Sequence, residues 1–257
     1  MAIAVFDSGI GGLSVLQQAR MFLPEKDYIY YADTAHVPYG TKSKEKVLEY
    51  VREAADFLLA QEGVEALVLA CNTATSVAAP FLRAQYEVPI LGMEPAVKPA
   101  VLADGAHRVL VTATPLTLHE KKMQDLLAKW DSAHLADLLP LPGLVELAER
   151  GIFTGAEAEG YLKGELAKYN LSDYSAIVLG CTHFNFFRET LRAILPQNMH
   201  IIDGTNGTVH NLAHQVSAKK EAGSVRYFNS YGKITDSAKL AYFQELLRVL
   251  TINMAIE

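Results

Sequence analysis

Short, uninterrupted apolar runs alternate with amphipathic stretches along most of this 257-residue chain. A run that is apolar at every position is typical of a parallel strand covered on both faces. Such runs occur at 2–6, 27–31, 65–70, 88–92, 107–112, 175–180 and 199–203. Amphipathic segments expected to form helices lie at 43–61, 117–130, 144–150, 155–169, 187–195 and 235–250. The alternation predicts an α/β fold with mainly parallel sheets.

The alternation is repeated within the chain. ALVLACNTAT at 66–75 and AIVLGCTHFN at 176–185 each place a cysteine and small polar residues after an apolar run. AVFDSG at 4–9 and VLVTAT at 109–114 form a second matched pair of strand and polar turn. The repetition predicts two related α/β units.

The second unit is expected to begin near residue 95. The segment 93–100 (MEPAVKPA) has the character of a connection between the units. The chain is expected to return to the first unit after Asp203. We therefore predict a first domain of residues 1–94 plus 204–257 and a second domain of residues 95–203.

Composition excludes several classes of protein. A net charge of −6 gives no broad basic surface, so no nucleic-acid partner is expected. No stretch approaches the ~20 apolar residues needed to cross a bilayer, and the start MAIAVFDSGIGG has no features of a secretion signal. We therefore expect no membrane association and a cytoplasmic location. Two cysteines in a chain of this length predict reduced thiols, not a disulfide framework.

Polar side chains follow several of the predicted strands. In open α/β sheets, ligands bind outside the carboxyl ends of the strands. Asp7 and Ser8, the Cys71–Thr73 segment, the Thr112–Thr114 segment and the Cys181–His183 segment all fall at such ends. If the two units face each other, the two thiols lie across one cleft.

Two thiols in one cleft admit several kinds of chemistry. A zinc site would need further ligands at short spacing, and the chain has no C-x-x-C pair. A nucleophilic Cys181 with His183 as its partner would leave Cys71 unused. Proton transfer on carbon is the remaining alternative: one group removes a proton from one face and the other delivers a proton to the opposite face. A thiol can take either role once its surroundings tune its pKa.

Four motifs make the chain resemble a known family. VFDSGIGGLSVL, YYADTAHVPYGTKS, VLACNTATSVA and IVLGCTHFNFFRETL, in this order, resemble the glutamate racemases of the cofactor-independent aspartate/glutamate racemase superfamily. The resemblance implies two flavodoxin-like domains related by a pseudo-twofold axis, with the active site in the cleft between them. It also implies no cofactor, no metal, glutamate as the small-molecule substrate, D-glutamate made for peptidoglycan, and a homodimer.

The resemblance also implies roles for single residues. Cys71 and Cys181 would be the paired acid/base thiols, with Asp7 assisting Cys71 and His183 assisting Cys181. Substrate contacts would come from Asp7, Ser8, Pro38, Tyr39, Gly40, Asn72, Thr73, Thr114, Thr182 and His183, with Tyr39 and Gly40 acting through backbone and hydroxyl groups. Glu149 matches a glutamate common in the family, but a solvated carboxylate at a helix end is the simpler interpretation.

Departures from the family pattern concern the substrate side chain. Phe184–Phe186 replaces an aromatic–proline pair, His119 and Lys122 stand in a segment that usually carries serine and tyrosine, and VRYFNSYGKITDSA near the C-terminus diverges. These changes leave racemisation of aspartate, or of a broader set of amino acids, as the nearest alternative. A non-catalytic binding protein on the same scaffold is a further alternative, which the presence of both thiols disfavours.

Overall fold

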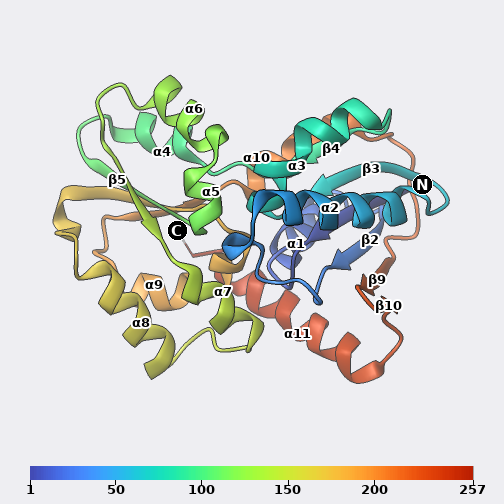
Figure 1. The fold of residues 1–257 in the computed structure, drawn as a ribbon. Helices are drawn as coiled ribbons and strands as arrows, with labels where there is room; N and C mark the ends of the chain where they lie inside the picture. The colour runs from blue at the N-terminus through green and yellow to red at the C-terminus, as the bar shows by residue number, and fades with distance from the viewer. Residues whose placement is uncertain (257) are drawn as a thin grey trace.

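The computed structural model describes residues 1–256, and its strands form two separate sheets (Figure 1). The strands are β1 (Ala2–Asp7), β2 (Asp27–Ala32), β3 (Val64–Leu69), β4 (Ile90–Gly92), β5 (Arg108–Ala113), β6 (Ala136–Pro140), β7 (Tyr174–Leu179), β8 (His200–Asp203), β9 (Val225–Asn229) and β10 (Gly232–Lys233). The first sheet has the order β10-β9-β2-β1-β3-β4 and the second β6-β5-β7-β8. All pairings are parallel except that of β9 with β10.

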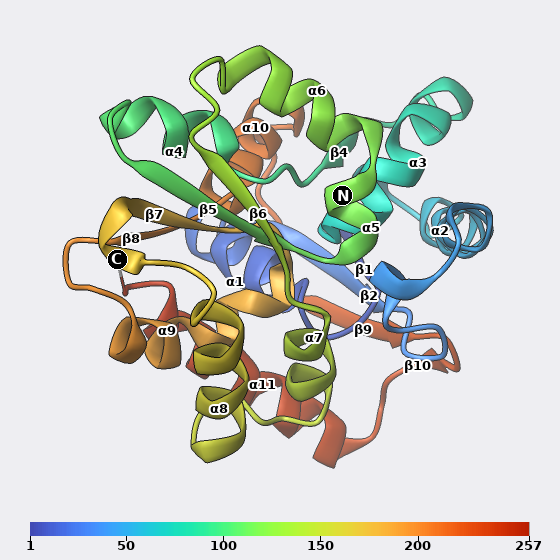
Figure 2. The ribbon, with the colours of Figure 1, turned by 60° about the vertical axis from the view of Figure 1, so that its left-hand side comes forward.

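Helices cover both faces of the sheets. They are α1 (Leu13–Phe22), α2 (Lys44–Leu59), α3 (Asn72–Gln85), α4 (Val97–Asp104), α5 (Pro115–His119), α6 (Lys121–Trp130), α7 (Pro142–Glu149), α8 (Ala156–Leu166), α9 (Arg188–Ile194), α10 (Thr205–Gln215) and α11 (Ser237–Asn253), with short 3₁₀ turns η1 (Tyr39–Thr41), η2 (Leu171–Asp173) and η3 (Thr182–Phe187). Figure 2 shows α4 and α6 on one side of the second sheet and α8 and α9 on the other. This covering explains why the central strands are apolar at successive positions. Within residues 1–256, every helix is too short or too polar to span a bilayer.

The two sheets repeat one strand order. In the first sheet β2-β1-β3-β4 are neighbours, and β6-β5-β7-β8 follow the same pattern in the second. Even the register shifts correspond, at Ala2/Ile3 between β1 and β3 and at Arg108/Val109 between β5 and β7. The predicted α/β fold with mainly parallel sheets is therefore confirmed, and β3 and β7 are equivalent strands.

Three strands, four helices and one helix break differ from the sequence predictions. The four helices that were not predicted are α1, α3, α4 and α10. β6, β9 and β10 were not predicted because they lie at or near the sheet edges, where partial exposure interrupts the apolar run. The segment 117–130 was expected to be one helix. The chain there is extended at Glu120 (φ −68°, ψ 144°), which separates α5 from α6.

A single apolar cluster reaches from one sheet to the other. It joins residues such as Val5 of β1 and Ile177 of β7 with side chains of α1 and α11. The end of α11 is fixed to the second sheet's side, because the Asn253 amide donates to the carbonyl of Phe186 at 2.7 Å. The C-terminus accordingly lies beside that half of the molecule in Figure 1.

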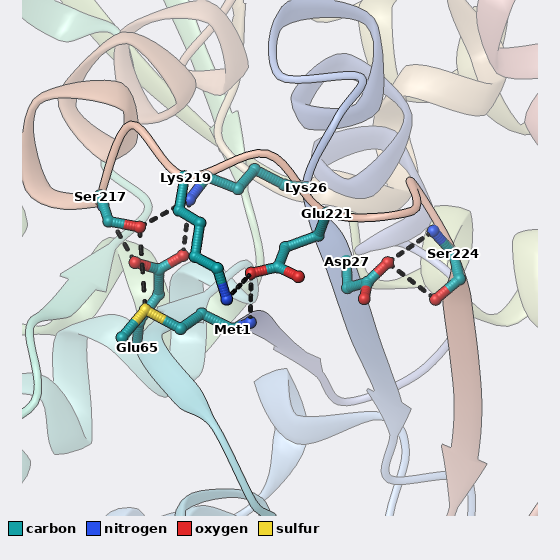
Figure 3. Close-up of polar contacts among 8 residues, drawn as sticks. All are labelled: Met1, Lys26, Asp27, Glu65, Ser217, Lys219, Glu221 and Ser224. Atoms are coloured by element: carbon teal, nitrogen blue, oxygen red, sulfur yellow. Dashed lines mark hydrogen bonds and ion pairs between the residues drawn. The ribbon is translucent and has the colours of Figure 1, made fainter.

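The segment from Ser217 to Ser224 runs along the amino ends of β2 and β3 (Figure 3). The buried Lys26 ammonium donates to Glu65 at 2.7 Å and to Ser217 at 3.0 Å. At the other end of the segment, the backbone and hydroxyl of Ser224 both donate to Asp27 at 2.8 Å. These contacts fix the start of β9, which carries the chain across to the carboxyl edge of the sheet.

Candidate active site between the two sheets

The two cysteines occupy equivalent positions after equivalent strands. Cys71 follows the end of β3 at Leu69, and Cys181 follows the end of β7 at Leu179, with one residue between in each case. Both thiols are free and buried. They are also close enough that a negative charge at Cys181 helps to raise the pKa of Cys71. The matched motifs of the sequence therefore bring the two thiols close enough for the charge of one to act on the other.

Cys71 lies in the first wall of the site, built by the carboxyl ends of β1 and β3. Its sulfur accepts a hydrogen bond from the Ala74 backbone at 3.4 Å and thereby caps the start of α3. The Ser8 hydroxyl is 3.6 Å from the same sulfur, within hydrogen-bond distance. The side-chain carbonyl of Asn72 is buried and has no protein partner within the described residues, so it is available to accept a bond from a ligand.

Cys181 lies in the second wall, where η3 follows β7. Its sulfur is 3.8 Å from Nδ1 of His183. The other ring nitrogen of His183, Nε2, is 2.7 Å from Oε1 of Glu149 at the end of α7. Glu149, His183 and Cys181 thus form a chain of successive contacts, the arrangement by which a histidine ring is oriented next to a thiol.

Glu149 is not the solvated helix-end carboxylate expected from the sequence. Besides His183, it accepts the Ile10 backbone N–H at 2.8 Å, from the glycine-rich turn of the first wall. That turn passes so close that a methyl carbon on Gly9 would stand 1.9 Å from Glu149 Oε1. The family match at this position was the available signal, and a glycine is needed at position 9 because Glu149 packs against it.

Asp7, at the end of β1 in the first wall, forms a hydrogen bond with the second wall. Its fully buried carboxylate accepts the Gly9 backbone N–H at 2.9 Å and the Thr182 hydroxyl at 3.0 Å. It therefore joins the first wall to the second. Its influence on Cys71 is electrostatic, because its negative charge raises the pKa of that thiol.

Three buried threonine hydroxyls form a triangle at another point between the walls. Thr73 is 2.9 Å from Thr114 and 3.0 Å from Thr117, and Thr114 is 2.9 Å from Thr117. Thr117 was not among the binding residues expected from the sequence. Gly40 packs directly on this group, since a methyl carbon there would be 2.3 Å from Thr114 Cβ.

The loop that carries Pro38, Tyr39 and Gly40 is organised by Asp33. The Tyr39 hydroxyl donates to Oδ2 of Asp33 at 2.5 Å, so this hydroxyl is engaged inside the protein. Tyr39 is buried beside Cys71 in the same apolar cluster, and Pro38 is half-buried at the start of η1. The backbone of the loop is therefore the better candidate for contact with a ligand.

The electrostatics of the two walls differ. Burial, together with the charges of Asp7 and Cys181, raises the pKa of Cys71 to about 12. Burial also raises the pKa of Asp7, although nearby His183 opposes this. Burial alone would lower the pKa of His183, but its hydrogen bonds to Cys181 and Glu149 and their charges leave it well above its ordinary value. The first wall thus favours a protonated thiol and the second a charged imidazole.

The site is closed to solvent in this structure, and no metal cluster is evident around it. Cys71, Cys181, Asp7 and His183 are each less than a tenth exposed. Within the described part of the chain, no group of three or more His, Cys, Asp and Glu side chains is placed to hold a metal ion.

Comparisons with known proteins show the family of the chain. Residues 14–212 match the family model described as Asp/Glu/Hydantoin racemase. A glutamate racemase of Campylobacter curvus is 47% identical over 98% of this chain and the full length of that protein. Glutamate racemase 2 of Bacillus subtilis is 46% identical over 97% of this chain and 96% of its own length.

Solved structures give the same result. Glutamate racemase of Escherichia coli, in complex with L-glutamate and the activator UDP-MurNAc-ala, superposes with a TM-score of 0.83 and 29% identity, covering 96% of this chain and 94% of that one. The Francisella tularensis glutamate racemase in complex with D-glutamate has a TM-score of 0.78 and 27% identity, covering 96% and 92% of the two chains.

Proposed function

We propose that this chain, which belongs to the glutamate racemases of the Asp/Glu/Hydantoin racemase family, interconverts L- and D-glutamate by proton transfer between two cysteines. The supporting observation is the pair of buried thiols placed at equivalent points of two equivalent sheets. Inverting a carbon that carries one hydrogen requires a base on one face and an acid on the other. Two thiols on opposite walls meet that requirement.

The two thiols are proposed to begin in different protonation states. Protonated His183, 3.8 Å from Cys181, stabilises a thiolate there, while Cys71, whose pKa is raised to about 12, holds its proton. The Cys181 thiolate removes the α-proton of one enantiomer, and the Cys71 thiol delivers its proton to the opposite face. The enzyme is left with a Cys181 thiol and a Cys71 thiolate, ready for the opposite enantiomer.

Charge that develops on the substrate must be met by groups already in place. The hydroxyls of Thr73, Thr114 and Thr117 can each turn a proton towards a carboxylate. The free carbonyl of Asn72 suits the α-ammonium group. Together these groups would hold one carboxylate and the α-ammonium group of an acidic amino acid, with Ser8 and Thr182 beside the two thiols.

The setting of the enzyme follows as part of the same proposal. D-glutamate made here would supply peptidoglycan synthesis in the cytoplasm, and the working form would be a homodimer. The two sheets support a division into residues 1–94 plus 204–257 and residues 95–203.

The experiment is a chiral assay without added cofactor. Both enantiomers of glutamate, aspartate and several neutral amino acids are offered in heavy water, and enantiomer ratio and α-deuterium are followed. We expect glutamate to be racemised with deuterium incorporation, and Cys71→Ala and Cys181→Ala each to abolish racemisation. Full turnover after loss of either thiol would exclude the two-base mechanism, and faster turnover of aspartate would exclude glutamate as the preferred substrate.

A further inference from the structure

Asp33 is a buried residue apart from the two thiols, and its carboxylate has three hydrogen-bond donors around it. Tyr39 donates to Oδ2 at 2.5 Å, Ser230 donates to Oδ1 at 2.6 Å, and Nδ1 of His36 lies 2.8 Å from Oδ1. Asp33 itself is 3% exposed, so these protein groups replace the water that would otherwise solvate it. The carboxylate therefore determines where the loop from residue 33 to residue 41 lies.

Ser230 is the donor from the most distant part of the chain. β9 pairs with β2 in parallel, and its last residue, Asn229, is the register partner of Ala32. Both chains leave the sheet at this level, which places Ser230 next to Asp33. The Ser230 oxygen also accepts the Ala35 backbone N–H at 3.0 Å, so it holds the loop at two points.

The position of this loop is passed on to the binding groups of the site. Tyr39 is followed by Gly40, which stands so close to Thr114 that a methyl carbon would be 2.3 Å from its Cβ. Thr114 in turn is 2.9 Å from the hydroxyl of Thr73 in the opposite wall. Because Gly40 and Thr114 are in such close contact, a displacement of the 33–41 loop would also displace the threonine hydroxyls.

We infer that Ser230 is a positioning residue: by donating to Asp33 it holds the Tyr39–Gly40 backbone and the threonine hydroxyls in the geometry that binds the substrate carboxylate. The inference rests on the proposed function. Ser230 touches neither thiol, so its loss weakens binding and leaves the proton-transfer groups in place.

The test compares two serines of the same strand region. Ser230→Ala should raise KM for both enantiomers of glutamate about 10-fold, equivalent to about 1.4 kcal/mol, with kcat changed less than about twofold. Ser230→Thr, which keeps the hydroxyl, should restore most of the affinity. Ser224→Ala is the matched control: that hydroxyl donates to Asp27 at the opposite end of β9 (Figure 3) and its loss should leave both constants unchanged.

Amide hydrogen exchange of the 33–41 segment gives a readout independent of turnover. Exchange there should accelerate in Ser230→Ala and not in Ser224→Ala. Wild-type KM in Ser230→Ala, a loss confined to kcat, or failure of Ser230→Thr to rescue would overturn the inference alone. Absence of glutamate racemisation by the wild-type protein would overturn the proposed function and this inference together.

Discussion

Gly9→Ala tests whether the closed contact between the two walls is required for activity. The backbone conformation at position 9 does not require glycine, because Gly9 is not among the residues with positive φ. Its restriction is one of space: an added methyl carbon would stand 1.9 Å from Oε1 and 2.8 Å from Cδ of Glu149. The substitution therefore pushes the Glu149 carboxylate away from its two partners.

The magnitude follows from the bonds that are broken. Glu149 accepts from Ile10 at 2.8 Å and lies 2.7 Å from His183. Hydrogen bonds to charged groups contribute about 1.5–3 kcal/mol each, so losing both removes about 3–6 kcal/mol of local stabilisation. If about 3 kcal/mol of this is lost from the transition state, kcat/KM falls by more than about 100-fold.

The assay is circular-dichroism detection of glutamate racemisation, with thermal unfolding measured on the same samples. Gly160→Ala is the control, because Gly160 lies in α8 with nothing within 4 Å of the added carbon. It should stabilise the protein by up to about 1 kcal/mol and leave kinetics unchanged. In a Glu149→Ala background, Gly9→Ala should cost little more, because the group it displaces is gone. Wild-type kcat/KM in a folded Gly9→Ala protein would refute the reasoning.

Three further changes have defined outcomes. Asp7→Asn removes a negative charge that, next to burial, contributes most to the raised pKa of Cys71. The pKa of Cys71 should therefore fall below about 12, which a pH titration of thiolate absorbance would measure. Thr117→Val keeps the volume but removes one hydroxyl of the triangle, so KM for glutamate should rise several-fold, to about 10-fold, in steady-state assays. Lys26→Ala leaves the Glu65 carboxylate without its buried partner and should lower the free energy of unfolding by about 3 kcal/mol. Urea titrations would measure this loss, and kcat should be retained. An unchanged midpoint of the urea titration would contradict the prediction.

Most of the fold was predictable because the central strands are covered on both faces. A strand such as β1 or β7, buried along nearly its whole length, leaves a continuous apolar run in the sequence. The edge strand β6 is partly exposed and leaves none. The β9–β10 hairpin is short and mixed in polarity for the same reason, so its place beside β2 could be found only in three dimensions.

The candidate site was predictable where residues follow strands directly. Asp7 and Cys181 stand at carboxyl ends of strands, and the rule for open α/β sheets is sufficient to group them. Asp33 follows β2 in the same way and could have been found by the same rule. The same rule does not find Glu149, because this residue ends a helix. It does not find Ser230 either, because Ser230 follows a strand that was not predicted. Their roles depend on contacts across the molecule, with Ile10 and Asp33 respectively.

Duplication of the fold supplies the two thiols, but duplication alone would give the wrong chemistry. Two identical walls would give the two thiols equal surroundings, so nothing in the protein would determine which of them carries the proton, whereas the proposed mechanism needs one thiol and one thiolate at the same moment. The difference comes from unlike neighbours: Asp7 raises the pKa of Cys71, whereas His183, with a raised pKa of its own, stands beside Cys181. The sheets set the positions of the thiols, and the loops supply their unlike neighbours.

Each neighbouring carboxylate is held by the wall opposite its own. Asp7, after β1, accepts from Thr182 after β7, and Glu149, at the end of α7, accepts from Ile10 in the first wall. Both bonds depend on contact between the two walls, and each holds a carboxylate whose charge acts on the chemistry of the site. The charge of Asp7 raises the pKa of Cys71, and the charge of Glu149 helps to raise the pKa of His183 beside Cys181. The contact between the walls therefore contributes to the unequal surroundings of the two thiols.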